Sequence, residues 1–166
     1  MPSKYVIIVR GIGAKMDDTQ SPMTLKPIGI VKNGIEQPTD ARNAWQKVVS
    51  EIVIDSSLTE ALDGLGGFSH IIVLYWMHQA ASGKLLLKVH PMGRTEVPRQ
   101  GLFAVRTPNR PNRIGKATVR LLQRQGNILR VEGLDALDGS PVIDIKPYLP
   151  GYDSVADARV PQWITN

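Results

Sequence analysis

Residues 101–115 combine arginine and proline in a pattern suited to holding an anion. The apolar run Leu102–Arg106 reads as a strand that ends at Arg106, and Arg110 and Arg113 follow beside Pro108 and Pro111. Proline fixes φ and removes a backbone donor, so we expect a loop that is rigid before any ligand binds. Guanidinium groups on such a loop suit carboxylates and phosphates. The plainer alternative is a turn between strands with solvated arginines.

Residues 133–148 carry the acidic counterpart. Asp138-Gly139-Ser140-Pro141 predicts a tight turn with the aspartate at its first position. Asp144 stands within an apolar strand, where a buried carboxylate is costly without a partner. Lys146 shares its face, so a structural ion pair between the two is a reasonable expectation.

The charge distribution gives a further hint of a polyanionic partner. The chain of 166 residues has a net charge of +5 and a pI of about 9.6. From Val97 to Val131 there is no Asp or Glu, whereas eight Arg and Lys residues occur. A solvated strand face with alternating arginines explains this run equally well.

Several classes of site are disfavoured by the residue types present. The chain has no cysteine, which excludes disulfides, thiolate metal ligands and cysteine nucleophiles. The three histidines, His70, His78 and His90, have no neighbouring carboxylates to complete a shell, so we predict no metal site. Gly11-Ile12-Gly13 lacks the third glycine of a dinucleotide fingerprint. The run Tyr5–Val9 is too short to span a bilayer, and we expect a cytoplasmic protein.

Fifteen glycines and twelve prolines indicate short strands and frequent turns. A capping box, Ser57 to Glu60, predicts one short helix at Leu58–Leu65. The predicted strands are Tyr5–Val9, Leu25–Val31, Val48–Ile54, Ser69–His78, Leu85–His90, Leu102–Arg106, the hairpin Lys116–Val131 and Val142–Ile145. We expect the strands that begin at Ser69, Leu85 and Leu102 to be buried.

Closing such a sheet removes its exposed edges. The expected fold is therefore mainly β, a single-sheet β-barrel with one or two short helices. We divide the chain into an N-terminal extension (1–24), the barrel domain (25–150) and a C-terminal tail (151–166).

Three blocks, in this order, resemble the tRNA-methyltransferase O family. They are Phe68-Ser-His-Ile-Ile-Val-Leu-Tyr-Trp-Met-His78, then Arg106 with Arg110-Pro-Asn-x-Ile-Gly115, then Asp135 with Asp138-Gly-x-Pro-Val and Asp144-Ile-Lys-Pro-Tyr148. The resemblance runs from about Pro27 to Pro150. It departs where Lys32 leads to Asn33 instead of the usual serine, and only Gln37-Pro38 is similar to the family's early loop. A further C-terminal domain, which some relatives carry, is not expected after Tyr152.

The resemblance implies a barrel, usually a homodimer, that binds S-adenosylmethionine and methylates N6 of threonylcarbamoyladenosine beside the tRNA anticodon. Carried over, the cofactor-binding residues are Met77, His78, Arg106, Arg110, Ile114, Ser140, Pro141, Val142 and Ile143. Arg106 or Arg110 would take the methionine carboxylate, and a carboxylate such as Asp138 would face the sulfonium.

For the chemistry, an acceptor for the proton of the amine would help, with His78 the first candidate and Asp138 the second. Phosphate contacts are expected from Arg113, Lys116, Arg120 and Lys146, and base stacking from Trp76 or Tyr148. Two alternatives stay open: an S-adenosylmethionine-dependent methyltransferase for a small molecule or another RNA, and a non-catalytic barrel that binds RNA or a nucleotide.

Overall fold

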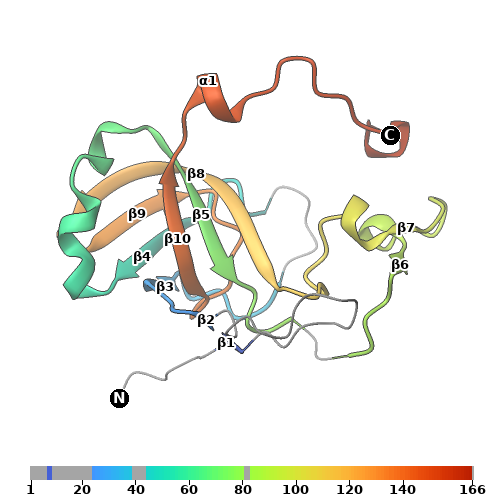
Figure 1. Cartoon of the computed structure of the whole chain (residues 1–166), viewed down its shortest axis with the longest axis horizontal. Helices are drawn as coiled ribbons and strands as arrows, with labels where there is room; N and C mark the ends of the chain where they lie inside the picture. The colour runs from blue at the N-terminus through green and yellow to red at the C-terminus, as the bar shows by residue number, and fades with distance from the viewer. Residues whose placement is uncertain (1–6, 9–23, 39–43, 81–82, 166) are drawn as a thin grey trace, which may run out of the picture.

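The computed structural model describes residues 7–8, 24–38, 44–80 and 83–165, and its centre is a closed six-stranded antiparallel barrel (Figure 1). The barrel strands follow the order β10-β3-β4-β9-β8-β5. Their bounds are β3 Gly29–Lys32, β4 Val49–Ile54, β5 His70–Trp76, β8 Ile114–Gln125, β9 Ile128–Glu132 and β10 Pro141–Pro147. The expected mainly-β barrel is confirmed, as is the β8–β9 hairpin.

Alternating burial along the strands fills the barrel. In β8, Gly115, Ala117 and Val119 point inward while Lys116 and Thr118 point outward. The core cluster is aliphatic at its centre, with no exposure at all for Val31, Ile52, Ile71, Val73, Leu129 and Val131. One face of each strand therefore makes the hydrophobic core, and the other face is available to solvent.

The predicted strand Leu25–Val31 is in fact two strands. β2 (Thr24–Leu25) pairs with β1 (Ile7–Ile8), whereas β3 belongs to the barrel. Pro27 lies between them and cannot donate to a ladder, which accounts for the break. The other residues of the predicted Tyr5–Val9 strand lie outside the described part of the chain.

The predicted helix is present in a tighter form that begins earlier. Ser56–Leu62 is a 3-10 helix, followed by a second at Leu65–Gly67. Asp55 caps the first, because its carboxylate accepts from the Ser57 amide at 2.9 Å and the Ser57 hydroxyl at 2.7 Å. The Ser57–Glu60 capping box was therefore wrong: an aspartate at the end of β4 takes that role.

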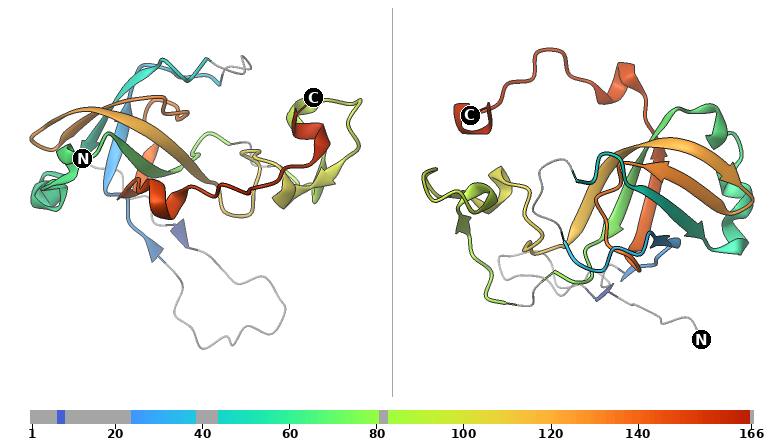
Figure 2. Two further views of the ribbon diagram at one scale, coloured as in Figure 1. Left: turned by 90° about the horizontal axis from the view of Figure 1, so that it is seen from above. Right: turned by 180° about the vertical axis from the view of Figure 1, so that it is seen from behind.

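Residues 84–104 form an outlying lobe beside the barrel rather than two buried strands (Figures 1 and 2). Only β6 (Lys88–Val89) and β7 (Gln100–Gly101) pair there, with short 3-10 turns at Pro91–Gly93 and Leu102–Ala104. Leu87 is 73% exposed and Phe103 79% exposed. The predictions of buried strands at Leu85–His90 and Leu102–Arg106 were wrong: within the first run only Lys88–Val89 forms a strand, which pairs with Gln100–Gly101, and the second run begins with the 3-10 turn Leu102–Ala104.

The tail leaves the barrel after β10 and returns to the outlying lobe (Figure 2). It contains two single-turn helices, α1 (Pro150–Asp153) and α2 (Gln162–Thr165). Arg94 of the lobe donates to the backbone oxygen of Trp163 at 3.5 Å. No helix in the described residues is long and apolar enough to cross a membrane.

Arg124 shows that the basic run is not simply a solvated face. Its guanidinium donates to the Leu62 and Thr59 backbone oxygens at 3.0 and 3.2 Å and to the Asp63 carboxylate at 2.8 Å. Arg124 therefore ties the first 3-10 helix to β8 and closes that end of the barrel. The opposite end stays open for the cavity described below.

Tyr75 and Gly115 pack closely against each other across two barrel strands. They are register partners on β5 and β8, and the Tyr75 ring occupies the space that a side chain at position 115 would need. A Cβ there would lie 2.7 Å from Cε1 of the ring and closer still to Cζ. Because Tyr75 is only 4% exposed, its ring has little room to move.

We therefore expect Gly115→Ala to lower the free energy of unfolding by about 1–3 kcal/mol, the usual cost of overpacking a filled core. Urea denaturation measures this. Gly66→Ala is the matched control, since a Cβ at Gly66 would meet nothing within 4 Å. Equal stability of the two variants would contradict the close packing of Tyr75 on Gly115.

Candidate functional site

A cavity of about 790 Å³ opens at the end of the barrel where β5 ends and β8 begins. Its other walls come from residues 103–110 and from the segment between β9 and β10. This volume is within the range of roughly 300–1,000 Å³ typical of sites for small molecules and cofactors. The arginine loop and the aspartate turn, 30 residues apart in sequence at Arg110 and Ser140, thus line the same cavity.

Six of the predicted cofactor-binding residues line this cavity, namely Met77, His78, Arg106, Arg110, Ile114 and Ser140. Three others do not. Pro141 and Val142 are buried where β10 pairs with β3, and Val142 has no exposed surface at all. Ile143 lies next to them on β10 and is half-buried. The side chain of Val142 therefore belongs to the core, beneath the cavity wall.

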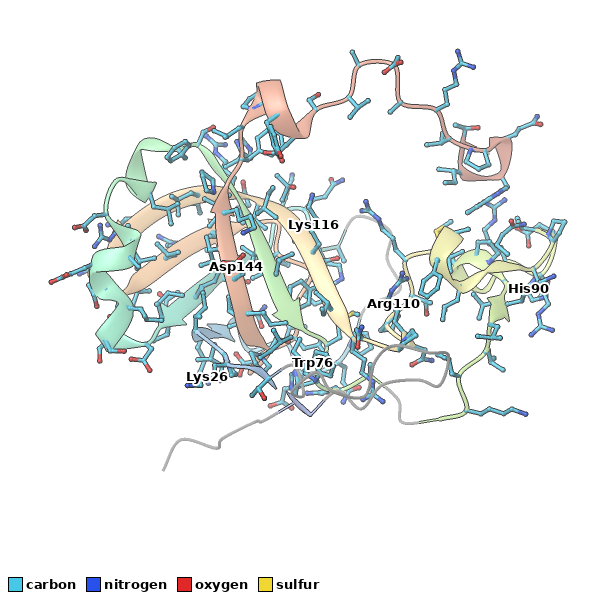
Figure 3. All side chains as sticks on the ribbon, viewed as in Figure 1. Lys26, Trp76, His90, Arg110, Lys116 and Asp144 are labelled. Atoms are coloured by element: carbon cyan, nitrogen blue, oxygen red, sulfur yellow. The ribbon has the colours of Figure 1, made fainter. Side chains whose placement is uncertain are left out.

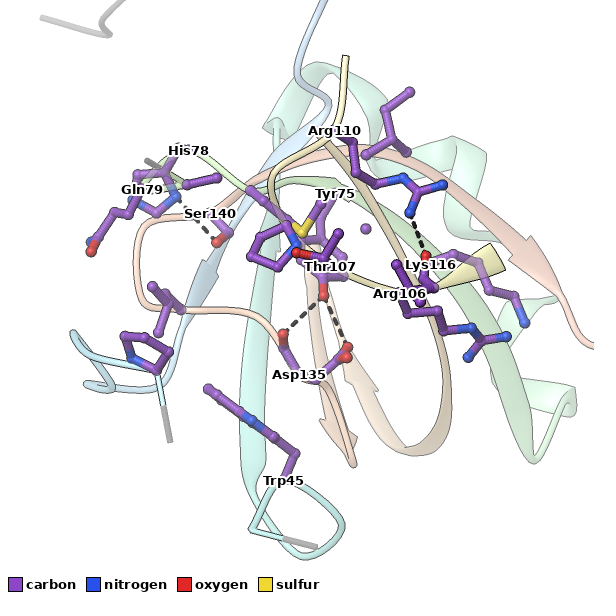
Figure 4. A pocket seen from close by; sticks show the side chains of 18 of the residues that line it. Trp45, Tyr75, His78, Gln79, Arg106, Thr107, Arg110, Lys116, Asp135 and Ser140 are labelled. Carbon is purple, nitrogen blue, oxygen red and sulfur yellow. Dashed lines mark hydrogen bonds between the residues drawn. The ribbon is translucent and has the colours of Figure 1, made fainter. Parts of the chain in front are cut away.

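The cavity has walls of different character (Figure 4). Arg106, Arg110 and Lys116 gather on one side, and His78, Gln79 and Ser140 lie on the other. Tyr75 and Asp135 lie between the two groups. An elongated ligand would meet cationic groups at one end and neutral polar groups at the other.

His78 rests on the turn that precedes β10. The Ser140 hydroxyl is 3.3 Å from its Nδ1, and a Cβ at position 139 would lie 3.9 Å from its Nε2. Burial lowers the pKa of His78 below its ordinary value, and the Asp138 charge offsets this only in part. At neutral pH the imidazole is therefore mainly uncharged and able to accept a proton.

Asp138 anchors the turn rather than facing the cavity. Its Oδ1 accepts from the backbone amides of Asn33 at 2.8 Å and Gly34 at 3.0 Å, and Lys32 lies 3.7 Å from Oδ2. The hydrogen bonds from the Gly34 amide, which has the larger effect, and from the Asn33 amide hold the pKa of Asp138 below its ordinary value. A carboxylate so occupied is a poor proton acceptor, although the sequence made it the second candidate for that role.

The turn itself begins one residue earlier than predicted. The Ser140 amide donates to the Leu137 backbone oxygen at 3.1 Å, so Asp138 is its second residue. Gly139 has a φ of 76°, a left-handed conformation that favours glycine. This geometry directs the Ser140 hydroxyl toward His78.

The two candidate arginines differ in how much of their guanidinium group is free. Arg110 donates through Nη1 to the Val105 backbone oxygen at 2.7 Å and lies 5.7 Å from the centre of the Phe103 ring. Arg106 makes no hydrogen bond or ion pair to the described residues, and its side chain lies beside that of Lys116 at the cavity wall (Figure 4). Arg110 therefore braces the loop, and Arg106 keeps its full set of donors for a ligand.

Tyr75 and Asp135 form a pair in the cavity that sequence reasoning missed. The Tyr75 hydroxyl donates to the Asp135 carboxylate at 2.9 Å and to the Asp135 backbone oxygen at 2.8 Å. Burial, together with the Asp135 charge, raises the pKa of Tyr75 far above its ordinary value, so the hydroxyl stays a donor. The signal was present: a tyrosine in an apolar strand needs a partner for its hydroxyl.

The early loop, where the sequence departs from the resemblance, also reaches the site. Gln37, Pro38 and Trp45 line the cavity. Asn33 is held in place by donating through Nδ2 to the Ser50 hydroxyl at 3.1 Å and the Ala136 backbone oxygen at 2.9 Å. Trp45 thus joins Tyr75 and Phe103 as an aromatic group at the cavity. Trp76 and Tyr148 lie elsewhere, paired with Ile114 across β5–β8 and packed edge-on against His70 respectively.

The predicted phosphate-binding residues lie mostly on the outside of the barrel. Lys116 (Figure 3) and Arg120 are exposed on the outer face of β8, and Lys146 is exposed on β10, two strands away. The expected ion pair forms, with Lys146 Nζ 2.7 Å from Asp144 Oδ2, but the carboxylate is 41% exposed rather than buried. Arg113 is in the loop before β8, where its backbone oxygen accepts from Met77. Of the four, only Lys116 lines the cavity.

Histidines and carboxylates do not gather into a metal-binding group. Among the described residues, no set of three or more His, Asp or Glu side chains is arranged to hold a metal ion. The charged groups at the cavity are the three cations and Asp135. Its recognition chemistry is therefore that of charge pairing and hydrogen bonding.

Comparison with known proteins identifies relatives over most of the chain. Residues 31–154 match the family model of the tRNA-methyltransferase O N-terminal domain. An S-adenosyl-L-methionine-binding protein of Archaeoglobus fulgidus is 47% identical over 80% of this chain and 94% of its own length. The mouse tRNA (adenine(37)-N6)-methyltransferase is 39% identical, over 60% of this chain and 23% of its own length.

The fold agrees with this relationship. The crystal structure of TrmO from Pseudomonas aeruginosa superposes with a TM-score of 0.70 at 30% sequence identity, covering 89% of this chain. This chain spans 64% of the length of that protein. On the family match and the shared barrel, the chain belongs to the tRNA-methyltransferase O family.

Proposed function

We propose that this protein binds S-adenosylmethionine in the barrel-end cavity and transfers its methyl group to an adenosine of tRNA. The acceptor is N6 of threonylcarbamoyladenosine at position 37, beside the anticodon, the position named for the mouse relative. The observation that carries the proposal is the cavity itself, which joins a free arginine, a neutral histidine and a carboxylate within about 790 Å³. The relatives named as S-adenosyl-L-methionine-binding proteins support the choice of cofactor.

The cavity's chemistry fits this cofactor. Arg106 suits the methionine carboxylate because its donors are free and planar. Met77 and Ile114 offer apolar surface for the adenine ring. The bound cofactor supplies an electrophilic methyl group on a positively charged sulfur.

The chain's own residues position the acceptor and take its proton. The N6 amine is a weak nucleophile, so a hydrogen-bond acceptor beside it helps the transfer. His78 is suited to this role because it is neutral near pH 7 and borders the cavity. The Ser140 hydroxyl next to Nδ1 fixes the orientation of the ring.

The tRNA itself would contact the cationic surface around the cavity mouth. Lys116 connects the cavity to the outer face of β8, where Arg120 lies four residues further along the same face of the strand. Arg113 in the loop before β8 and Lys146 on the outer face of β10 would supply further phosphate contacts. Such phosphate contacts are salt-sensitive. A homodimer, the arrangement that the resemblance implies, would present two such surfaces to one anticodon stem-loop, in the cytoplasm where we expect the protein.

A direct test incubates the protein with methyl-labelled S-adenosylmethionine and two tRNA preparations, one carrying threonylcarbamoyladenosine and one lacking it. Label in the methylated nucleoside of the first preparation alone is expected, by nucleoside mass spectrometry. Label in both, or in neither while the cofactor is still bound, would favour another acceptor. Failure to bind the cofactor by calorimetry would leave the RNA-binding barrel as the better description.

The two arginines should separate in their effects. Arg106→Gln should weaken S-adenosylmethionine binding by about tenfold or more, since hydrogen bonds to charged groups contribute roughly 1.5–3 kcal/mol. Arg110→Gln should mainly lower the free energy of unfolding and weaken binding less, because Arg110 holds the Val105 backbone oxygen. Calorimetry and urea denaturation measure the two effects. A stable Arg110→Gln protein with the larger loss of affinity would reverse the assignment.

The rate of methyl transfer should depend on pH through His78. Its pKa is lowered by burial, so the accepting neutral form predominates above that pKa and is lost as the pH falls through it. Single-turnover rates should therefore be flat near pH 7 and fall in mildly acidic solution. His78→Gln should reduce the rate by about a hundredfold and remove the acidic limb. A variant that keeps the wild-type profile would exclude His78 as the acceptor.

A further inference from the structure

Asp135 is the only carboxylate among the described residues that line the cavity, and it faces a surplus of positive charge. Arg106, Arg110 and Lys116 line the same space. The nearby Asp138 is occupied by backbone amides and Lys32, and Asp144 pairs with Lys146 on the outer face. Negative charge within the cavity therefore rests on one side chain.

The structure holds this carboxylate in place without neutralising it. Tyr75 donates an uncharged hydroxyl to Oδ1, and no ion pair to Asp135 occurs within the described residues. The Tyr75 ring is itself fixed against Gly115, where any side chain would collide with it. A buried aromatic thus positions a charged group at the cavity surface, with its second oxygen left for a ligand.

We propose that Asp135 is the residue by which the cavity distinguishes the cationic S-adenosylmethionine from its neutral product, S-adenosylhomocysteine; this inference rests on the function proposed above. The two molecules share the adenosine, the carboxylate and the α-ammonium group. They differ in one methyl group and in the positive charge on sulfur. The three cations of the cavity disfavour that charge, and Asp135 is the side chain that offsets them.

The same arrangement favours release of the product. When the carbon–sulfur bond breaks, its electron pair stays on sulfur and the positive charge there disappears. The attraction to Asp135 is lost at that point, while the contacts to the shared groups are unchanged. The effect is moderate because Asp135 is solvent-exposed, so salt and water screen it.

Calorimetric titration with three ligands tests the inference by binding alone. The ligands are S-adenosylmethionine, S-adenosylhomocysteine and sinefungin, whose amine replaces the sulfonium with a different cationic group. Asp135→Asn keeps an oxygen that can accept from Tyr75 and removes only the charge. We expect it to weaken binding of both cationic ligands by about three- to tenfold and to leave the neutral ligand within twofold.

Asp157→Asn is the matched control, because it makes the same change in net charge on the exposed tail, outside the cavity. It should leave all three affinities unchanged. Equal weakening of all three ligands by Asp135→Asn would overturn the inference, since it would mean that Asp135 contacts the shared α-ammonium group. Unchanged affinities would overturn it as well.

Two further measurements keep the test decisive. Should Asp135→Asn unfold, Tyr75→Phe is the second variant. It retains the charge of Asp135 but removes the hydrogen bond that holds the carboxylate, so it should reduce the ratio by which the protein binds the cationic ligands more tightly than S-adenosylhomocysteine. In the wild type, raising the salt concentration should narrow that preference too; a preference insensitive to both changes would refute the role of Asp135. A wild-type protein that binds none of the three ligands would instead refute the proposed function.

Discussion

The contact between Tyr75 and Gly115 determines how the barrel core meets the cavity. A tyrosine inside a barrel must bury its ring and still find a partner for its hydroxyl. Both needs are met because β8 has no side chain at Gly115, so the ring lies across that strand and its hydroxyl reaches Asp135 at the rim. The position of a charged group at the cavity is thereby fixed by packing in the core. A site supported in this way loses little freedom when a ligand binds.

The rest of the cavity is held by backbone hydrogen bonds rather than by charge pairs. Asp138 connects the turn before β10 to the residues after β3, and the Asn33 side chain connects those residues to Ser50 on β4 and to the Ala136 backbone oxygen between β9 and β10. Arg110 braces its own loop in a similar way. The charges that serve structure are thus satisfied internally, and Arg106 and Asp135 are left for recognition. This division explains why two arginines four residues apart are not equivalent.

Much of the fold could be predicted from the sequence. Apolar and polar residues alternate along β8, as its burial pattern does, and the turn at Gly126 is typical of a hairpin. The prediction failed at Leu85–His90 and Leu102–Arg106, since an apolar run does not reveal whether its partner strand belongs to the barrel. In the site, the arginine loop and the aspartate turn, which the sequence predicted to meet, line the same cavity at Arg106, Arg110 and Ser140. The sequence analysis chose Asp138 rather than Asp135 as the carboxylate of the site. Only the structure shows that Tyr75 holds Asp135 at the cavity, whereas Asp138 accepts from backbone amides.

The cavity walls come from two kinds of segment, and this suggests how one barrel can serve different acceptors. Residues at strand ends, such as Met77 and Ile114, are fixed by the register of β5 and β8. Gln37, Pro38 and Trp45 belong to the connection between β3 and β4, which can change without altering any barrel pair. If the strand ends hold the cofactor, as proposed, substitutions in that connection alter the acceptor side alone. Under that proposal, the departure from the family pattern at Asn33 and in the loop around Gln37-Pro38 bears on the choice of acceptor and leaves the cofactor side intact.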